Sequence, residues 1–390
     1  MIEVVFSNDF HAAFKRGLPA LAAMWAAKDR GAIVLDGGDF LGEAFFTHYR
    51  GTGSAEALQD RLFDALCPGN HGFEESCRSP RAVCCNLWEE GRQVCAPYRL
   101  FDRQGARVAV TAVLGEEAFG AIPTGHRRGF TVSAPAAALA VLLPRLREMS
   151  DCLIVVSHCG FAEDEKLARA VPGLSFVLSA HCHSARFFSS MSGAVIAKAP
   201  EYGAGYGRAL LDAKGGIDVS IFATVEYDGT AVGHPQLQAI GADLAELEAE
   251  ADRLLGAHDP RFYSLVQNRD AYVSALATAL SASCDGARLV VGRYGFRILP
   301  KQPQLRVEAL YDLFPFENRL VRIGLTDQVT AALREIEHHP DYLVVAAGAT
   351  PSPFLVTTDY LALNVLGLPE QTLQPFETMR DRLGSILVAA

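Results

Sequence analysis

Short motifs rich in aspartate, histidine and asparagine recur through the first half of the chain. They are Asp9-Phe10-His11, Gly37-Gly38-Asp39, Gly69-Asn70-His71, Ser157-His158-Cys159-Gly160 and His181-Cys182-His183. Carboxylate, imidazole and amide oxygen together suit divalent ions such as Zn, Mn, Fe or Mg, whereas thiolates favour softer ions. His181 and His183 are two residues apart, so in an extended segment their side chains face the same way. The motifs predict a metal site, in which a carboxylate shared by two ions would hold them about 3.5–4 Å apart.

Most of these motifs directly follow apolar runs that predict β-strands. The strands expected before the motifs are Ile2–Ser7, Ala32–Asp36, Cys152–Ser157 and Leu174–Ala180. Gly69-Asn70-His71 instead follows a run that predicts a helix, Ala55–Leu66. Another helix is expected at Leu18–Asp29, and further strands at Arg107–Leu114, Ala194–Ala199, Arg208–Asp212 and Asp218–Val225. This alternation is typical of an α/β protein, in which sites form at the carboxyl ends of strands.

Each motif taken alone also has a purely structural interpretation. Gly69-Asn70-His71 could be a plain turn, and a single histidine at the end of a strand is more often structural than functional. The occurrence of all the motifs in order, each after a predicted element, favours one shared site over several unrelated structural roles.

The segment His234–Gly256 predicts a long amphipathic helix that separates two domains. Leucine, isoleucine and alanine recur there every three or four residues, with acidic residues between them. We expect a first domain over residues 1–230, a connecting helix within 231–258 and a second domain over 259–390; a surface helix inside one domain is the alternative. The second domain is expected to contain helices at Asp270–Ser283 and Thr326–Ile336, and strands at Arg288–Val291, Leu320–Leu325 and Tyr342–Ala347.

The composition excludes several classes of protein. Half of the 390 residues are apolar and 21% are charged, which excludes a disordered chain. The net charge of −10 argues against a nucleic acid polymer or a membrane surface as partner. No uncharged apolar run reaches about 18 residues, so no transmembrane helix is expected. The start Met1-Ile2-Glu3 lacks a basic segment, so we expect no signal peptide; because the nine cysteines include no C-x-x-C pair, we expect reduced thiols and a cytoplasmic location.

The ordered set of motifs resembles that of the calcineurin-like metallophosphoesterases and, more narrowly, that of the 5'-nucleotidase family. Two further stretches are similar to that family, Glu201–Arg208 and Leu313-Phe314-Pro315-Phe316-Glu317-Asn318. The resemblance implies an α/β fold, with an N-terminal four-layer α/β/β/α metallophosphoesterase sandwich and a second, smaller α/β domain that supplies the substrate-specificity pocket.

The resemblance also implies a role for each residue of the motifs. One ion would be held by Asp9, His11 and His183, and the other by Asn70, His158 and His181, with Asp39 as the bridge between them. His71 would be the catalytic histidine, which stabilises the transition state or protonates the leaving group. An ordinary histidine pKa of about 6.5 suits it to donate a proton.

One departure from the family pattern concerns the partner of His71. The family has an aspartate three residues after this histidine, which orients its ring, whereas this chain has Glu74. We expect Glu74 to complete the catalytic pair with an altered geometry. Glu75 is a competing candidate, and the alternative for Glu74 is a solvated loop position.

Residues near the C-terminus resemble the substrate site of the family. Arg297 matches an arginine that grips the substrate, and Arg293 is a second candidate. Phe316 matches a base-stacking aromatic, a contact worth roughly 1–3 kcal/mol, and Asn318 matches its polar neighbour. The glycine-rich stretch that carries a second aromatic in the family is absent, and Tyr360 could be a core residue instead.

These expectations combine into a dinuclear metallohydrolase. The leading hypothesis is a two-metal phosphoesterase that uses a metal-bound hydroxide to hydrolyse a nucleotide or a similar small anionic phosphorylated substrate. The alternatives on the same scaffold are a 2',3'-cyclic nucleotide phosphodiesterase and a sulfur-ester hydrolase of the thiosulfohydrolase type. A metal-binding interaction module with a dead site is the alternative that is not an enzyme. The sequence assigns no oligomeric state.

Overall fold

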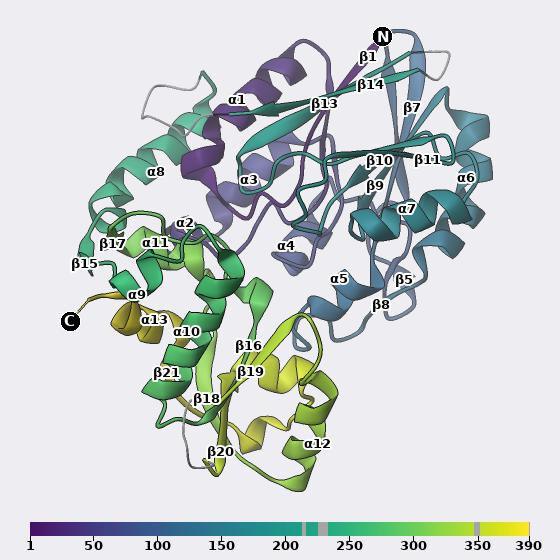
Figure 1. Cartoon of the computed structure of the whole chain (residues 1–390). Helices are drawn as coiled ribbons and strands as arrows, with labels where there is room; N and C mark the ends of the chain where they lie inside the picture. Colours follow the sequence, from purple (N-terminus) through teal and green to yellow (C-terminus); the bar gives the residue numbers. More distant parts are fainter. Residues whose placement is uncertain (213–215, 225–232, 347–351, 390) are drawn as a thin grey trace. The chain divides into compact units, whose positions relative to one another are not determined.

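The computed structural model describes residues 1–212, 216–224, 233–346 and 352–389 (Figure 1). The chain divides into two compact units, Met1–Glu246 and Leu247–Ala390, and the boundary falls within helix α8 (Pro235–Ala251). Each unit has its own sheets and hydrophobic cores.

Two sheets form the centre of the first unit. The strand order of the first sheet is β14 (Ile217–Ala223), β13 (Gly205–Leu211), β1 (Ile2–Ser7), β2 (Ile33–Asp36) and β3 (Ala65–Leu66). The order of the second is β11 (Phe188–Met191), β12 (Ala194–Ala197), β10 (Phe176–Ser179), β9 (Cys152–His158), β7 (Ala106–Leu114) and β6 (Tyr98–Arg103). A small third sheet contains β5 (Arg92–Gln93), β4 (Leu87–Glu89) and β8 (Phe130–Val132). Strands β1, β2 and β3 are parallel, and so are β7, β9, β10 and β12.

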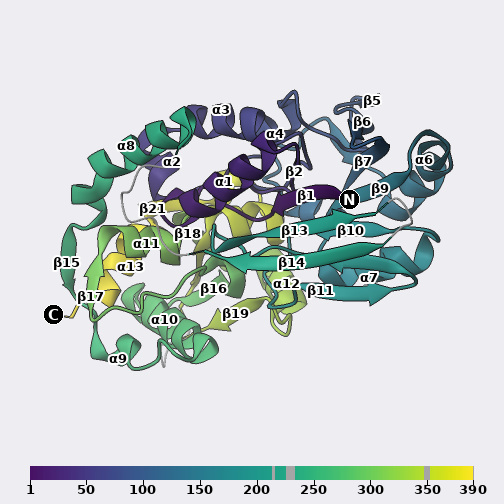
Figure 2. The same ribbon diagram turned by 90° about the horizontal axis from the view of Figure 1, so that it is seen from above.

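The two main sheets pack face to face, and helices cover their outer faces. The helices of the first unit are α1 (Phe14–Asp29), α2 (Phe45–Arg50), α3 (Gly53–Leu62), α4 (Phe73–Arg78), α5 (Glu116–Ala121), α6 (Pro135–Met149) and α7 (Phe161–Ala170). Helix α1 packs on the first sheet and contacts α3, whereas α6 and α7 pack on the second sheet, on the opposite side of the unit (Figures 1 and 2). The first unit is therefore the expected four-layer α/β/β/α sandwich.

Strand β9 shows why the sequence folds into these layers. Its apolar run places Ile154 and Val156 in the core between the sheets, and Leu153 and Val155 in the core beneath α6 and α7. Successive side chains of a strand point to opposite faces, so a strand buried on both faces is apolar throughout.

The second unit is a smaller three-layer arrangement. Its main sheet has the order β19 (Tyr342–Val345), β16 (Arg288–Gly292), β20 (Phe354–Thr358), β18 (Arg319–Gly324) and β21 (Gln374–Thr378); β15 (Leu254–Ala257) and β17 (Gln304–Arg306) form a separate pair. Its helices are α9 (Pro260–Tyr263), α10 (Arg269–Ser283), α11 (Val307–Leu313), α12 (Asp327–Ile336) and α13 (Met379–Leu387). Leu289 and Val291 pack in the core with α10 and α13, whereas Val290 packs in the core with α12.

The expected strands and helices are present, with corrections to two helices. The run Ala55–Leu66 is a helix only to Leu62, because its last two residues pair with β2 as strand β3. Helix α8 ends at Ala251, before the expected end at Gly256, and Leu254 is 52% exposed because Leu254–Ala257 pairs with β17 as β15. Val225 and Ala347, expected at the ends of two strands, lie outside the described residues.

Among the residues that the structure describes, no helix has both the length and the apolar composition needed to cross a bilayer.

Candidate metal centre

The motif residues lie at the carboxyl ends of parallel strands from both sheets of the first unit. Asp9 follows β1, Asp39 follows β2, His158 ends β9 and His181 follows β10. Gly69-Asn70-His71 also follows a strand, β3, rather than the helix that the sequence predicts. Backbone hydrogen bonds extend the β1–β2 pairing into the loops, since the Asp9 and His11 N–H groups donate to the Gly38 and Asp39 carbonyls at 2.9 and 2.8 Å.

The backbone at these positions adopts a conformation that L-residues rarely occupy. The φ angles of Asp9, His11, Asp39 and His181 are +48°, +50°, +58° and +76°. A residue other than glycine in a sparsely populated backbone region costs of order 1–3 kcal/mol, and such residues cluster at functional sites. The close approach of the chain to Asp39 requires glycine at Gly69, because a Cβ there would lie 1.8 Å from Asp39 Oδ1.

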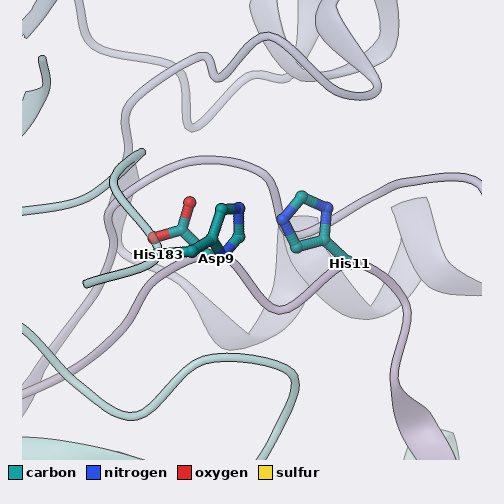
Figure 3. Close-up of side chains that lie close together, drawn as sticks. All are labelled: Asp9, His11 and His183. Atoms are coloured by element: carbon teal, nitrogen blue, oxygen red, sulfur yellow. The ribbon is translucent and has the colours of Figure 1, made fainter. Parts of the chain in front are cut away.

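Asp9, His11 and His183 form a first group whose potential ligand atoms all lie within 4.8 Å of one another (Figure 3). Asp9 is fully buried and accepts hydrogen bonds from Asn8 Nδ2 at 2.8 Å and from the His181 N–H at 3.1 Å. Burial raises the pKa of Asp9, which a nearby cation would counteract.

Asn70, His158 and His181 form a second group. Asn70 Oδ1 lies 3.2 Å from His158 Nε2 and 3.0 Å from His181 Nδ1. His158 Nδ1 lies 2.9 Å from the Gly37 carbonyl oxygen, which only accepts, so Nδ1 carries the proton in the neutral ring. Its Nε2 lone pair then faces the Asn70 oxygen, another electron donor, and a cation between these two atoms would satisfy both.

Asp39 lies between the two groups and is 1% exposed. Its Oδ1 is 3.4 Å from His158 Nε2, and its Oδ2 is 3.9 Å from His11 Nε2. One carboxylate oxygen thus faces each group, which is the arrangement that a bridging ligand requires. Burial opposes ionisation of Asp39, but His158, His71 and His11 outweigh it and hold its pKa well below the usual range.

When no ion is bound in the second group, His158 carries an additional proton instead. Burial disfavours the charged form of His158, yet Asp39 raises the pKa of His158 to about 9. Burial and the neighbouring His158 lower the pKa of His181 to about 3, so its imidazole is neutral. An ion that enters this group would displace the His158 proton, as metal binding to imidazoles generally does.

His71 lies beside these groups and is partly exposed. Its ring meets that of His11 edge-on, with centroids 4.8 Å apart, and its N–H donates to Asp39 Oδ1 at 2.9 Å. His71 is therefore next to the first group and to the shared Asp39, and it retains access to solvent.

Sequence relatives point to nucleotidases, although no protein-family model matches the chain. A 5'-nucleotidase of Diplobatis ommata is 22% identical over 217 residues, which cover 47% of this chain and 37% of that protein. The trifunctional nucleotide phosphoesterase YfkN of Bacillus subtilis is 22% identical over 366 residues, which cover 78% of this chain and 25% of YfkN. The chain therefore spans little more than a third of the first relative and a quarter of the second.

Solved structures share the fold over nearly the whole chain. The 5'-nucleotidase precursor of Thermus thermophilus has a TM-score of 0.72 at 15% identity, covering 100% of this chain and 97% of that one. The 5'-nucleotidase of Candida albicans has a TM-score of 0.72 at 14% identity, covering 99% and 97%. The chain has the 5'-nucleotidase fold. A sulfate thiohydrolase of Thermus thermophilus also shares it, with a TM-score of 0.72 at 15% identity over 96% of this chain and 81% of that one.

Glu74, the expected partner of His71, makes a different contact within this 5'-nucleotidase fold. It lies in α4, and its carboxylate is 3.2 Å from His126 Nδ1, with 47% of the Glu74 side chain exposed. The orienting role for Glu74 stays a prediction.

Substitution of Glu74 tests that role. If Glu74 is the solvated position that its exposed contact with His126 favours, Glu74→Gln is expected to lower kcat no more than about threefold, because an exposed ion pair contributes little. Steady-state kinetics measures this, and a loss as large as that of a His71 variant would instead establish Glu74 as the functional partner of His71.

The residues of the expected substrate site lie in the second unit of the fold. Arg297 lies over the Phe316 ring, 5.4 Å from its centroid. Arg293 lies in a 3-10 turn, 3.9 Å from the exposed Asp270 carboxylate. Asn318 is partly buried, and Tyr360 packs against the core beside α12, as its alternative interpretation as a core residue predicts. The structure thus brings Arg297 and Phe316 into contact.

Sequence reasoning missed two functional candidates, Glu201 and Lys198. Glu201 Oε2 lies 2.6 Å from His183 Nδ1, and Lys198 forms an ion pair with Glu201. The only signal in the sequence is that Glu201 begins a stretch similar to the family.

Proposed function

We propose that the chain is a two-metal phosphoesterase that hydrolyses a nucleotide or a similar small phosphorylated metabolite. The observation that carries this proposal is the place of Asp39, one oxygen of which faces each of two groups of ligand atoms. The nucleotidase and phosphoesterase relatives and the 5'-nucleotidase fold support it. In this proposal the first unit carries the dinuclear centre, α8 connects the units and the second unit selects the substrate.

The donor set fits two hard or borderline divalent ions. Buried carboxylates, imidazoles and an amide oxygen converge there, and the partly buried Asn70 Oδ1 lies 3.2 Å from His158 Nε2. Asp9, His11 and His183 would hold one ion, Asn70, His158 and His181 the other, and Asp39 would bridge them. When bound, two such ions supply Lewis acidity to the phosphoryl oxygens and lower the pKa of a bound water to about 7.

The residues of the chain supply charge balance and proton transfer. Asp9 and Asp39 are both fully buried. Their two negative charges offset only half of the four positive charges of two divalent ions. The centre therefore stays positive and attracts an anionic phosphate ester. His71, on the exposed side, is placed to donate a proton to the leaving oxygen.

Replacement of His71 tests this division of roles. Loss of a general acid typically costs 10²–10⁴ in rate, so we expect His71→Ala to lower kcat about 100-fold or more. Metal analysis of the same sample is expected to show that both ions remain, because His71 is not among the proposed ligands. A variant that loses an ion would show that His71 is itself a ligand.

A substrate panel tests the proposed function. The metal-loaded protein would be assayed against nucleoside monophosphates, other small phosphomonoesters, 2',3'-cyclic nucleotides and a thiosulfonate ester. We expect the highest kcat/KM with a monoester, by at least about tenfold. A preference for cyclic or sulfur esters would select one of the alternative hydrolases, and two bound ions without turnover of any ester would indicate a binding module.

A further inference from the structure

A short segment after β12, residues 198–202, contacts Asp9, His11 and His183, the residues of the first group. The Tyr202 ring stacks near the rings of His11 and His183, with centroids 5.2 and 5.3 Å apart. The Tyr202 N–H donates to the Asp9 carbonyl at 2.9 Å. The Ala199 N–H donates to Asn8 Oδ1 at 2.7 Å, and the amide of Asn8 donates in turn to the Asp9 carboxylate.

Glu201 in this segment determines which nitrogen of His183 is available. The Glu201 side chain is 13% exposed, and its Oε2 lies 2.6 Å from His183 Nδ1. A carboxylate only accepts hydrogen bonds, so in the neutral ring Nδ1 carries the proton and Nε2 keeps the lone pair that a cation needs. A carboxylate behind a histidine also raises its basicity and fixes its ring.

Lys198 holds both Glu201 and the loop that carries His183. The Lys198 side chain is fully buried, and its ammonium group forms an ion pair with Glu201. It also donates to the carbonyl oxygens of Cys182 at 2.7 Å and Ser184 at 2.6 Å, the residues on either side of His183. All three donors of this buried ammonium therefore have partners, as a buried charge requires.

The two ion positions differ in the group behind one histidine of each, His183 in the first and His158 in the second. His183 has a negatively charged carboxylate at Nδ1, whereas His158 has the neutral carbonyl of Gly37, at 2.9 Å. Removal of the charge of Glu201 should therefore act on the first position and spare the second.

We propose that Glu201 is a positioning residue that selectively strengthens ion binding by Asp9, His11 and His183, and that Lys198 keeps it in place. This inference rests on the proposed function, because it needs two ions. Substitution of an outer carboxylate typically weakens metal affinity 10–100-fold, which sets the expected size of the effect.

Titration of the metal-free 390-residue protein with Co²⁺ tests the proposal, with calorimetry and visible absorption as readouts. We expect the wild type to bind two ions. Glu201→Gln is expected to bind one of them about 10–100-fold more weakly and the other within about threefold of wild type. Glu163→Gln is the matched control, because Glu163 is exposed on α7 and pairs only with Lys166 among the contacts that the structure gives. It removes the same charge and is expected to leave both affinities unchanged.

A pair of further variants separates positioning from folding. Lys198→Met is expected to lower the Tm of the metal-free protein, because it leaves the buried Glu201 without its cation. The double variant Lys198→Met, Glu201→Gln removes both charges and is expected to regain most of that Tm while it keeps the weakened affinity.

Three outcomes would overturn the proposal. Unchanged binding of both ions by Glu201→Gln, or equal weakening of both, would overturn the inference alone. A wild type that binds no ion would overturn the proposed function as well.

Discussion

Asp39→Asn is expected to lower kcat by three to four orders of magnitude. The two oxygens of Asp39 face different groups of ligand atoms, and an amide offers one neutral oxygen where the carboxylate offers two charged ones. A loss of this size corresponds to about 4–5.5 kcal/mol of transition-state stabilisation. Kinetics at saturating Mn²⁺, together with metal analysis, measures it; we expect fewer than two ions per chain.

Asp36→Asn is the matched control for this substitution. Asp36 is as deeply buried as Asp39 but accepts hydrogen bonds from Ser7 Oγ at 2.8 Å and the Gly38 N–H at 3.0 Å. Burial raises the pKa of Asp36 well above its usual range, and an amide keeps the shape of its side chain. We expect kcat within about tenfold of wild type. Equal losses in the two variants would assign the effect of Asp39→Asn to loop folding rather than to bridging.

Removal of divalent ions by a chelator is the second change expected to have a large effect. Without cations, His158 in the second group is protonated, and the group of Asn70, His158 and His181 has no metal ion to polarise a phosphate. We expect activity to fall by at least about 10⁴-fold and to return when Mn²⁺ or Zn²⁺ is added. Initial rates before chelation, after it and after reloading measure this.

Circular dichroism of the chelated sample is the control for unfolding. The ligand loops are held by their own hydrogen bonds, such as His11 N–H to the Asp39 carbonyl at 2.8 Å, so we expect an unchanged spectrum. Full activity in excess chelator would contradict the two-metal mechanism.

The sequence predicts the first unit well because its signals are local. The apolar runs of β1 and β9 mark strands buried on both faces, and the motif residues follow directly after them. Carboxyl ends of parallel strands meet at one edge of a sheet, so residues far apart in sequence can be expected at one site. The structure brings Asp9, Asp39 and His158 together in this way.

The sequence-based predictions fail where pairing with a residue distant in sequence overrides the local pattern. The end of the Ala55–Leu66 run has helical composition, yet Ala65 pairs with Leu35 of β2. Leu254 fits the apolar repeat of the α8 sequence, yet it lies in strand β15 and pairs with Arg306 of β17. Glu201 is 18 residues beyond His183, and only the return of the chain through β12 brings their side chains into contact.

The span of the proposed centre along the chain has a consequence for its biosynthesis. The His181 N–H reaches the Asp9 carboxylate across 172 positions, and the Ala199 N–H reaches Asn8 across 191. During translation, the earliest ligands emerge long before the last ones, and contacts of such wide separation form late. A ribosome-bound fragment that ends before His183 would thus lack part of the proposed ligand set, and ion binding would show that the first unit has folded.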